Sequence, residues 1–190
     1  CTPVRVPVDR FQPSKSQRRC ARRNADLRVE IGPPVLSDDK IQLYHRYQTE
    51  RHGKPKIASE KTSDVSDTTD GPADATVAEE LRTFLYDSPV DTVEFSYFDR
   101  AERLLGVGIG DVSARSLSSV YFYYDPTAAH RSLGVFSALA EIGFCREREI
   151  PHYHLGFWVH GCAKMRYKTD FQPCELLLPT GEWVDAEGLK

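Results

Sequence analysis

The sequence predicts a mixed α+β domain with a mostly antiparallel central sheet flanked by helices. Helical patterns come first along the chain, and three strand-like runs with short polar breaks follow between residues 92 and 124. A further helix, a strand and a terminal hairpin come last. Successive strands with short connections favour antiparallel pairing, and helices placed before and after them must cover the faces of the sheet. This order of elements therefore indicates an α+β fold.

The first 31 residues read as a basic arm, which we expect to be the end of an N-terminal domain, with the main domain over 32–190. Pro3 and Pro7 disfavour helix in the residues before them, so Cys1 to Val8 is expected to be extended. Ser14 to Asn24 is expected to form a short helix. Its basic residues are Lys15, Arg18, Arg19, Arg22 and Arg23. They form either a solvated surface or a contact for nucleic-acid phosphates.

Two helices are predicted before the strands. The first begins at Ser37 and ends at Gly53, and it has acidic residues in its first turn, where the helix dipole favours them. Residues 54–74 are rich in Ser, Thr, Asp and Gly and poor in apolar residues, which predicts a mobile loop. Thr76 and Glu79 form a capping box that should open the second helix.

The second half of the chain carries the sheet. The expected strands are Thr92–Phe98, Leu104–Val112, Leu117–Tyr124 and His152–Val159. A helix is expected over Arg131–Glu147, and a hairpin is expected from 171–178 and 182–184. The residues of this helix that its spacing directs towards the core are Leu133, Phe136, Leu139, Ala140 and Phe144.

Composition narrows the function classes. The formal net charge of −3 gives no global case for nucleic-acid binding, so such binding would need a local patch. Five cysteines at scattered positions form no disulfide framework and indicate reduced thiols in a cytoplasmic protein. No apolar run approaches the length of a membrane span. Because the chain opens on Cys1 rather than Met, we expect it to be part of a longer protein.

The junction between the third strand and the following helix is the strongest local feature. The strand ends at Asp125-Pro126, and Arg131-Ser132-Leu-Gly134 opens the helix. Free amides at a helix N-terminus attract phosphate, and Gly134 would let a ligand approach the backbone. The arrangement resembles the acyl-carrier loop of the Gcn5-related acetyltransferase fold. Phe136 stands where that loop has a small residue, which argues against ordinary pyrophosphate binding; a capped helix with a surface arginine is the structural alternative.

Two further segments are rich in reactive side chains. Residues 152–160 hold three histidines, but the spacing along a strand suits a zinc site poorly, so a histidine that accepts a proton is preferred. Residues 162–168 form a basic turn in which Lys164, Arg166 and Lys168 could hold a carboxylate or a phosphate. The dense aromatics at 121–124 should send two rings to each sheet face. One pair belongs to the core, and the other could contact a base or an amino-acid side chain.

Read together, these segments resemble the arginyl-tRNA–protein transferase family, and in particular its bacterial aspartate/glutamate leucyltransferase branch. The matching segments are Cys1-Thr-Pro-Val-Arg-Val-Pro-Val8, Ser14-Lys-Ser-Gln-Arg-Arg19, Arg23-Asn24, Tyr44-x-x-Tyr47, Arg51-His52, Leu117-Ser-Ser-Val-Tyr121, Asp125-Pro126, Arg131-Ser-Leu-Gly134, Leu155-Gly156, Cys162-x-Lys-Met-x-Tyr-Lys168 and Phe171-x-Pro-x-Glu175. An ordered set spread over nearly the whole chain is more specific than any one motif.

The resemblance implies a C-terminal catalytic domain of the acetyltransferase-like fold that uses charged tRNA as co-substrate and needs no cofactor for transfer. Such an enzyme moves leucine or arginine onto proteins with an N-terminal Asp or Glu, which marks them for degradation. The family's N-terminal part carries a cysteine cluster for a metal or an iron–sulfur cluster. Cys1 matches its last cysteine, but the partner cysteines are absent from this chain.

The resemblance also implies roles for residues. Catalytic candidates, for positioning the amine or handling its proton, are Tyr121, Tyr124, Asp125 and His154. Substrate-binding candidates are Arg131, Ser132, Gly134, Lys164 and Lys168, of which Arg131 and the two lysines could pair with the acidic acceptor. The five basic residues of the first helix are the candidates for contacting tRNA.

The donor and the class of protein have alternatives. A donor site for arginine would need a buried acid, with Glu94, Asp125 and Glu175 as candidates, whereas a site for leucine would be apolar. The Pro3-Val-Arg-Val-Pro7 opening and the short connections resemble the bacterial branch, and this resemblance implies leucine. An N-acetyltransferase on the same fold and a non-catalytic tRNA-binding module are the competing classes.

Overall fold

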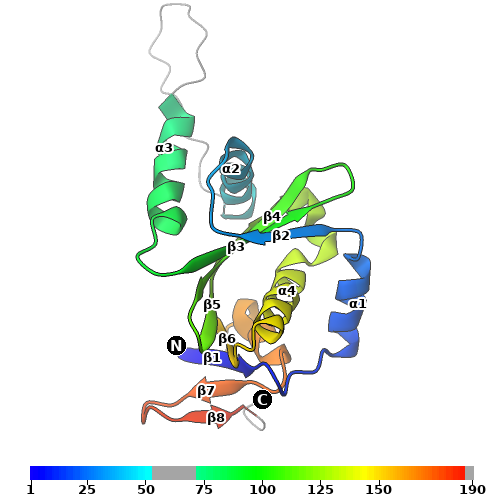
Figure 1. The fold of residues 1–190 in the computed structure, drawn as a ribbon, viewed down its shortest axis with the longest axis vertical. Helices are drawn as coiled ribbons and strands as arrows, with labels where there is room; N and C mark the ends of the chain where they lie inside the picture. The colour runs from blue at the N-terminus through cyan, green and yellow to red at the C-terminus, as the bar shows by residue number, and fades with distance from the viewer. Residues whose placement is uncertain (53–71, 187–190) are drawn as a thin grey trace, which may run out of the picture.

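A computed structural model gives the fold of residues 1–52 and 72–186. Eight strands build one sheet, with four α-helices packed against it (Figure 1). The strands are β1 (Thr2–Pro7), β2 (Arg28–Gly32), β3 (Thr92–Phe98), β4 (Leu104–Val112), β5 (Ser116–Tyr124), β6 (His152–Trp158), β7 (Glu175–Leu177) and β8 (Trp183–Asp185). The helices are α1 (Lys15–Arg23), α2 (Asp38–His52), α3 (Pro72–Leu81) and α4 (Leu133–Glu147). Shorter helical turns are η1 (Arg82–Tyr86), η2 (Pro126–Arg131) and η3 (Ala163–Asp170).

The sheet is almost entirely antiparallel, in the order β2-β3-β4-β5-β6-β1-β7-β8. The exception is β5 with β6, which run parallel because α4 lies between them in sequence. The α+β class with a mostly antiparallel sheet is therefore confirmed. The first strand of the chain sits deep in the sheet, between β6 and β7, and pairs with β6 from Thr2 to Pro7.

Two helix layers cover opposite faces of the sheet. Helices α1 and α4 lie side by side on one face, and α2 and α3 lie on the other (Figure 1). Strand β3 contacts both helix layers, because alternate side chains of a strand point to opposite faces of the sheet. Phe95 and Tyr97 join the core under α4. Glu94 and Ser96 point to the other side, where Glu94 pairs with Lys40 of α2 at 2.5 Å.

Most predicted elements are present where the sequence placed them. Strands β3 and β4 have the predicted bounds, and Ser14 caps α1 through a capping box with Gln17. The arm of residues 1–31 contributes β1, α1 and β2 to the common sheet and helix layer. The start of the second predicted helix was wrong: α3 begins at Pro72, so Thr76 lies inside it. The predicted mobile loop 54–74 was too long, because residues 72–74 belong to α3, and its residues 54–71 lie outside the described part of the chain.

Helix α4 turns the predicted apolar residues towards the core but buries two polar residues as well. Leu133 and Phe144 are buried as expected, and Phe136, Leu139 and Ala140 are partly buried against the core. Ser137 and Glu141 are also buried. They lie against Gly108 of β4, where an added Cβ would stand 3.1 Å from the Ser137 hydroxyl and 3.2 Å from Glu141 Oε1. The glycine-rich face of β4 therefore makes room for two polar residues that were not among the predicted core positions of the helix.

Within the described ranges, no helix combines the length and the apolar character needed to cross a bilayer.

A candidate active site between strands β5 and β6

Strands β5 and β6 separate soon after they meet. They pair only through Ser116–Ser118 and His152–His154. Beyond those residues β5 stays paired with β4, and β6 stays paired with β1, so a gap opens between the two strands. A cavity of about 520 Å³ is lined by residues of both strands, by the N-terminal half of α4 and by η3. We call it the wedge cavity.

The N-terminus of α4 forms one wall of the wedge cavity. Ser132 precedes the helix in the left-handed conformation, at φ 57°, and makes no side-chain cap. The amides of Val135 and Phe136 donate to the Ser132 carbonyl. The amides of Leu133 and Gly134 have no acceptor among the described residues, as is usual for the first turn of a helix. Gly134 is exposed, and a Cβ there would only touch the Phe122 ring, at 3.8 Å. The fold itself therefore does not require glycine at this position.

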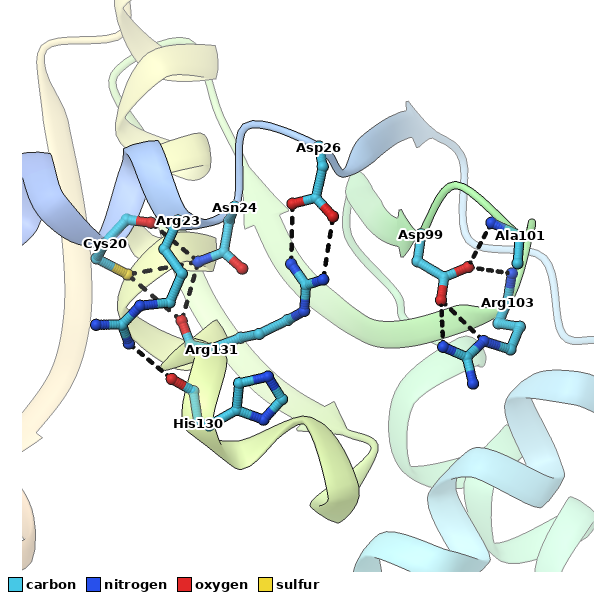
Figure 2. A network of polar contacts seen from close by, with 9 residues as sticks. All are labelled: Cys20, Arg23, Asn24, Asp26, Asp99, Ala101, Arg103, His130 and Arg131. Atoms are coloured by element: carbon cyan, nitrogen blue, oxygen red, sulfur yellow. Dashed lines mark hydrogen bonds and ion pairs between the residues drawn. The ribbon is translucent and has the colours of Figure 1, made fainter.

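Polar contacts fix this helix start against α1 (Figure 2). The buried Asn24 side chain donates to the carbonyl oxygens of Cys20, at 3.0 Å, and Arg131, at 2.9 Å. Arg23 donates to the His130 carbonyl at 2.6 Å. The α1 helix and the turn before α4 thus form one hydrogen-bonded unit.

Arg131 is engaged in the same network. Its guanidinium makes a two-pronged ion pair with Asp26, at 2.9 and 3.0 Å, and this hydrogen bonding holds the pKa of Asp26 below its ordinary value (Figure 2). The sequence suggested Arg131 as a cation for the substrate. The structure shows that it tethers the chain before β2 to the start of α4.

Lys168 brings a cation into the wedge cavity. Its side chain extends from η3 over Gly156 of β6, and its ammonium donates to the Phe157 carbonyl at 2.9 Å. No described carboxylate lies within ion-pair distance of it. Burial lowers the pKa of Lys168. Of the cations suggested by the sequence, Lys168 is placed at the site; the side chain of Lys164 lies outside the described part of the chain.

Glu141 of α4 lies at the floor of the wedge cavity. It is 1% exposed, and its two oxygens accept hydrogen bonds from Ser137, at 2.7 Å, and from Tyr153, at 2.8 Å. Burial raises the pKa of Glu141, although the hydrogen bonds from Ser137, Tyr153 and Ser119 act in the opposite direction. Sequence reasoning missed this residue because it assigned position 141 to no chemistry and to no core face.

The basic helix α1 meets the site through a second, smaller cavity of about 170 Å³. This small cavity shares Ser132, Val135 and Tyr167 with the wedge cavity. Arg19 and Arg23 line its other side. Lys15, Arg18 and Arg22 are also exposed on α1. Two residues of the predicted basic patch, Arg19 and Arg23, therefore reach a cavity that adjoins the wedge cavity.

Two predicted catalytic residues, Asp125 and His154, are not among the residues that line the wedge cavity. Asp125 caps η2 by accepting from the Thr127 amide, at 2.9 Å, and hydroxyl, at 2.7 Å. His154 lies on the sheet face opposite to Tyr153, against the ring of Trp183 at 5.4 Å. Burial is the largest cause that lowers the pKa of His154.

The two predicted tyrosines both line the wedge cavity. Tyr121 accepts a hydrogen bond from Gln48 of α2 at 3.1 Å, and burial raises its pKa. Tyr124 packs on Tyr47, with the ring centroids 5.3 Å apart. Alternation along β5 places Tyr123 in the core beneath α2, but its same-face neighbour Tyr121 is only partly buried, so one ring is in the core where the sequence predicted a pair. The tyrosines at 121 and 124 thus form an aromatic rim on the β5 side.

The described residues contain no group of three or more His, Cys, Asp or Glu side chains that could hold a metal ion. Cys1 is exposed at the start of β1. The residues that the structure describes therefore do not fit a metal or iron–sulfur group.

Two solved structures share the fold. The structure of L-PGS from Bacillus licheniformis superposes with a TM-score of 0.54 at 10% identity, and covers 97% of this chain and 57% of that one. The C-terminal domain of an Agrobacterium fabrum protein described as a lysylphosphatidylglycerol synthetase gives a TM-score of 0.60 at 12% identity, with the same coverage. At such low identity the likeness concerns the fold alone.

Sequence comparison is more specific. The chain is 39% identical over 175 residues to an aspartate/glutamate leucyltransferase of Stenotrophomonas maltophilia, and 36% identical over 187 residues to one of Teredinibacter turnerae. It covers 65% and 70% of the lengths of these relatives, and they match 92% and 98% of the chain. Residues 39–178 match the family described as arginine-tRNA-protein transferase, C terminus. The chain belongs to the arginine-tRNA-protein transferase family, of which it carries the C-terminal region.

Proposed function

We propose that this chain is the catalytic part of an aminoacyl-tRNA–protein transferase that moves leucine from charged tRNA onto proteins beginning with Asp or Glu. The observation that carries the proposal is the wedge cavity beside the basic helix α1, in a chain whose relatives are named aspartate/glutamate leucyltransferases. A cavity of about 520 Å³ has room for an aminoacyl group and for the first residue of an acceptor.

The reaction needs little chemical activation. The free amine of the acceptor attacks the ester carbonyl between the amino acid and the terminal ribose of the tRNA. The C–N bond forms, the bond to the ribose oxygen breaks, and one proton passes from the amine to that oxygen. Attack requires a neutral amine, and free α-amines titrate at about 7.7–8.0. Since the ester is already activated, positioning and stabilisation of the oxyanion should supply most of the rate.

The site offers matching groups for these tasks. The free amides of Leu133 and Gly134 at the start of α4 can donate to the developing oxyanion or to a phosphate of the donor. The apolar side chains of Leu133, Val135 and Leu155 can contact the leucyl group. The rim formed by Tyr121 and Tyr124 can stack on the terminal base.

The basic helix provides a path for the tRNA. Arg19 and Arg23 reach the small cavity that joins the wedge cavity, while Lys15, Arg18 and Arg22 continue the patch along α1. Lys and Arg side chains neutralise phosphates without reading sequence. We propose that the acceptor stem lies along α1 and directs the charged terminus past Ser132 into the wedge cavity.

Lys168 is our candidate for recognising the acidic acceptor. It is a cation in the wedge cavity without a described carboxylate partner, so the side chain of an N-terminal Asp or Glu could supply one. We further propose that the sheet, with its parallel β5–α4–β6 unit, is of the Gcn5-related acetyltransferase type, and that the protein works in the cytoplasm, where charged tRNA is found.

The test charges tRNA with labelled leucine or arginine and offers peptides that begin with Asp, Glu or Ala to the full-length protein. We expect leucine transfer to the Asp and Glu peptides and none to the Ala peptide. Absence of transfer from either donor would refute the proposed function. Transfer of arginine alone would refute the assignment of leucine as donor.

A further inference from the structure

The floor of the wedge cavity holds a buried acid that the reaction described above does not use. Glu141 is 1% exposed and has no cationic partner among the residues that the structure describes. Its carboxyl oxygens instead accept hydrogen bonds from two hydroxyl groups, those of Ser137 and Tyr153. A buried carboxyl without a cation disfavours folding relative to an apolar side chain of similar size. Packing alone therefore does not explain this residue.

The hydrogen bonds of these hydroxyl groups all run, from donor to acceptor, towards the Glu141 carboxyl group. The Tyr97 hydroxyl donates to Ser137 at 2.9 Å, and Ser137 donates to Glu141 at 2.7 Å. On the other side, the Tyr153 hydroxyl donates directly to Glu141 at 2.8 Å. Both chains of hydrogen bonds end on the carboxyl group. A proton taken up by the Tyr153 oxygen can thus be passed to Glu141 without movement of any heavy atom.

Tyr153 connects this network with the cavity. Its side chain lines the wedge cavity, as do Ser119, Leu133 and Leu155. Glu141 lines the same cavity, and the Tyr153 hydroxyl is the group on the β6 side that is hydrogen-bonded directly to its carboxyl group.

We propose that Glu141 is the temporary proton acceptor of the transfer reaction and acts through the Tyr153 hydroxyl. The inference rests on the proposed function. As the amine nitrogen forms its bond to the ester carbon, its proton passes to the Tyr153 oxygen, and the Tyr153 proton passes to Glu141. When the bond to the ribose oxygen breaks, the proton returns by the same hydroxyl to that oxygen. Glu141 is then ionised again, and one proton has moved from nitrogen to oxygen.

The other titratable groups around Glu141 do not compete for this role. Tyr97 of β3, Tyr153 of β6, Tyr167 of η3 and Cys145 of α4 all have pKa values raised by burial, so they stay protonated near neutral pH. Lys168 is the cation that lines the same cavity, and its ammonium is held by a carbonyl oxygen. Glu141 is thus the group in this cluster that can take up a proton.

The test measures kcat/KM for leucine transfer against pH with full-length wild type, Glu141→Gln and Tyr153→Phe. The wild-type rate requires an ionised Glu141 and a neutral amine, so its acidic limb should steepen from a slope of one to a slope of two below the pKa of Glu141. Glu141→Gln should lose about 100-fold, within the range for acid–base catalysis, and should keep a slope of one throughout. Tyr153→Phe should show a similar loss. Glu141→Asp should recover part of the rate and the steeper limb.

Glu94→Gln is the matched control. Glu94 is another buried acid that accepts from a tyrosine hydroxyl, that of Tyr86 at 3.0 Å, but it lies on the opposite face of the sheet. Its replacement should leave the slopes unchanged. If Glu141→Gln does not fold, Tyr153→Phe decides by itself, because it retains the carboxyl group.

Each remaining outcome is distinct. A Glu141→Gln profile parallel to that of the wild type would show a structural role and overturn the inference. A raised KM for charged tRNA with unchanged slopes would also overturn it, because Glu141 would then bind the ammonium group of the donor. If the wild type transfers nothing, the proposed function fails and the inference falls with it; if the wild type is active and the slopes do not change, only the inference fails.

Discussion

Replacing Lys168 with Met tests how the site recognises an acidic acceptor. Met keeps the length and the apolar stem of the side chain but removes the charge that donates to the Phe157 carbonyl at 2.9 Å. A hydrogen bond to a charged group contributes about 1.5–3 kcal/mol, and the partial exposure of Lys168 favours the lower end of that range. Since about 1.4 kcal/mol corresponds to a tenfold change, a loss of about 1.5–2 kcal/mol should weaken use of an Asp acceptor by roughly 10- to 30-fold.

The assay compares kcat/KM for two peptides that differ only in having Asp or Asn at the first position. The wild type should prefer Asp, because only Asp offers a charge to Lys168. The Lys168→Met variant should lose most of that preference while its KM for charged tRNA is unchanged. Arg166→Met is the control, since Arg166 is exposed on the same helical turn. An Asp-to-Asn ratio in Lys168→Met equal to that of the wild type would refute the assignment of Lys168 to the acceptor.

Three further predictions concern the surroundings of the cavity. His154→Gln should leave transfer nearly unchanged, because His154 lies on the opposite sheet face. It should also make the melting temperature depend less on pH. In the wild type, the lowered pKa of His154 contributes stability above the unfolded pKa of about 6.5, and this stability is lost as pH falls through the folded pKa. Gly134→Ala should hold or raise the melting temperature, with a gain of up to about 1 kcal/mol for a helical position, but should raise the KM for charged tRNA if the donor approaches this backbone; an unchanged KM would exclude that approach. Arg19→Ala should reduce the slope of log binding constant against log salt for tRNA by about 0.9, and an unchanged slope would remove Arg19 from the contact.

Local patterns predicted the elements whose structure depends on their own side chains. The Ser14 cap and Gln17 satisfy each other within one turn of α1, so the helix start follows from four consecutive residues. Alternate side chains of β3 and β4 face the two helix layers, so the sequence pattern of each strand predicts it without knowledge of its neighbours. The hairpin of β7 and β8 follows from its turn, where Gly181 adopts φ 88°.

The position of β1 could not be predicted from such patterns. Its pairing with β6 joins Thr2 to Trp158, and nothing in the first residues specifies a partner so far along the chain. Strand β2 was missed for a related reason. Val29 and Ile31 do alternate with Arg28 and Glu30, but the alternation spans only five residues at the edge of the sheet and lies in the segment that was predicted to be a basic arm.

Glu141 shows how a long-range contact changes the meaning of a helix position. A charged residue in a helix is expected on the solvent side, and Glu141 was not among the residues that the apolar spacing directed towards the core. The decisive signal was in another strand, where Gly106, Gly108 and Gly110 occupy alternate positions of β4 and so leave one of its faces without side chains. Such a face requires a close neighbour. Reading the glycines together with the polar positions Ser137 and Glu141 of α4 would have indicated a buried polar contact.

The same geometry bears on the choice of donor. The three acids that the sequence offered for an arginine donor all lie elsewhere: Glu94 pairs with Lys40 on the other sheet face, Asp125 caps η2, and Glu175 pairs with Arg5 at 2.6 Å. Glu141 is the acid in the wedge cavity, but hydroxyl groups already occupy both of its oxygens. A guanidinium would have to displace them or remain buried without a counter-charge, which is costly. A leucyl side chain needs only the apolar wall, and we therefore expect leucine to be transferred in preference to arginine.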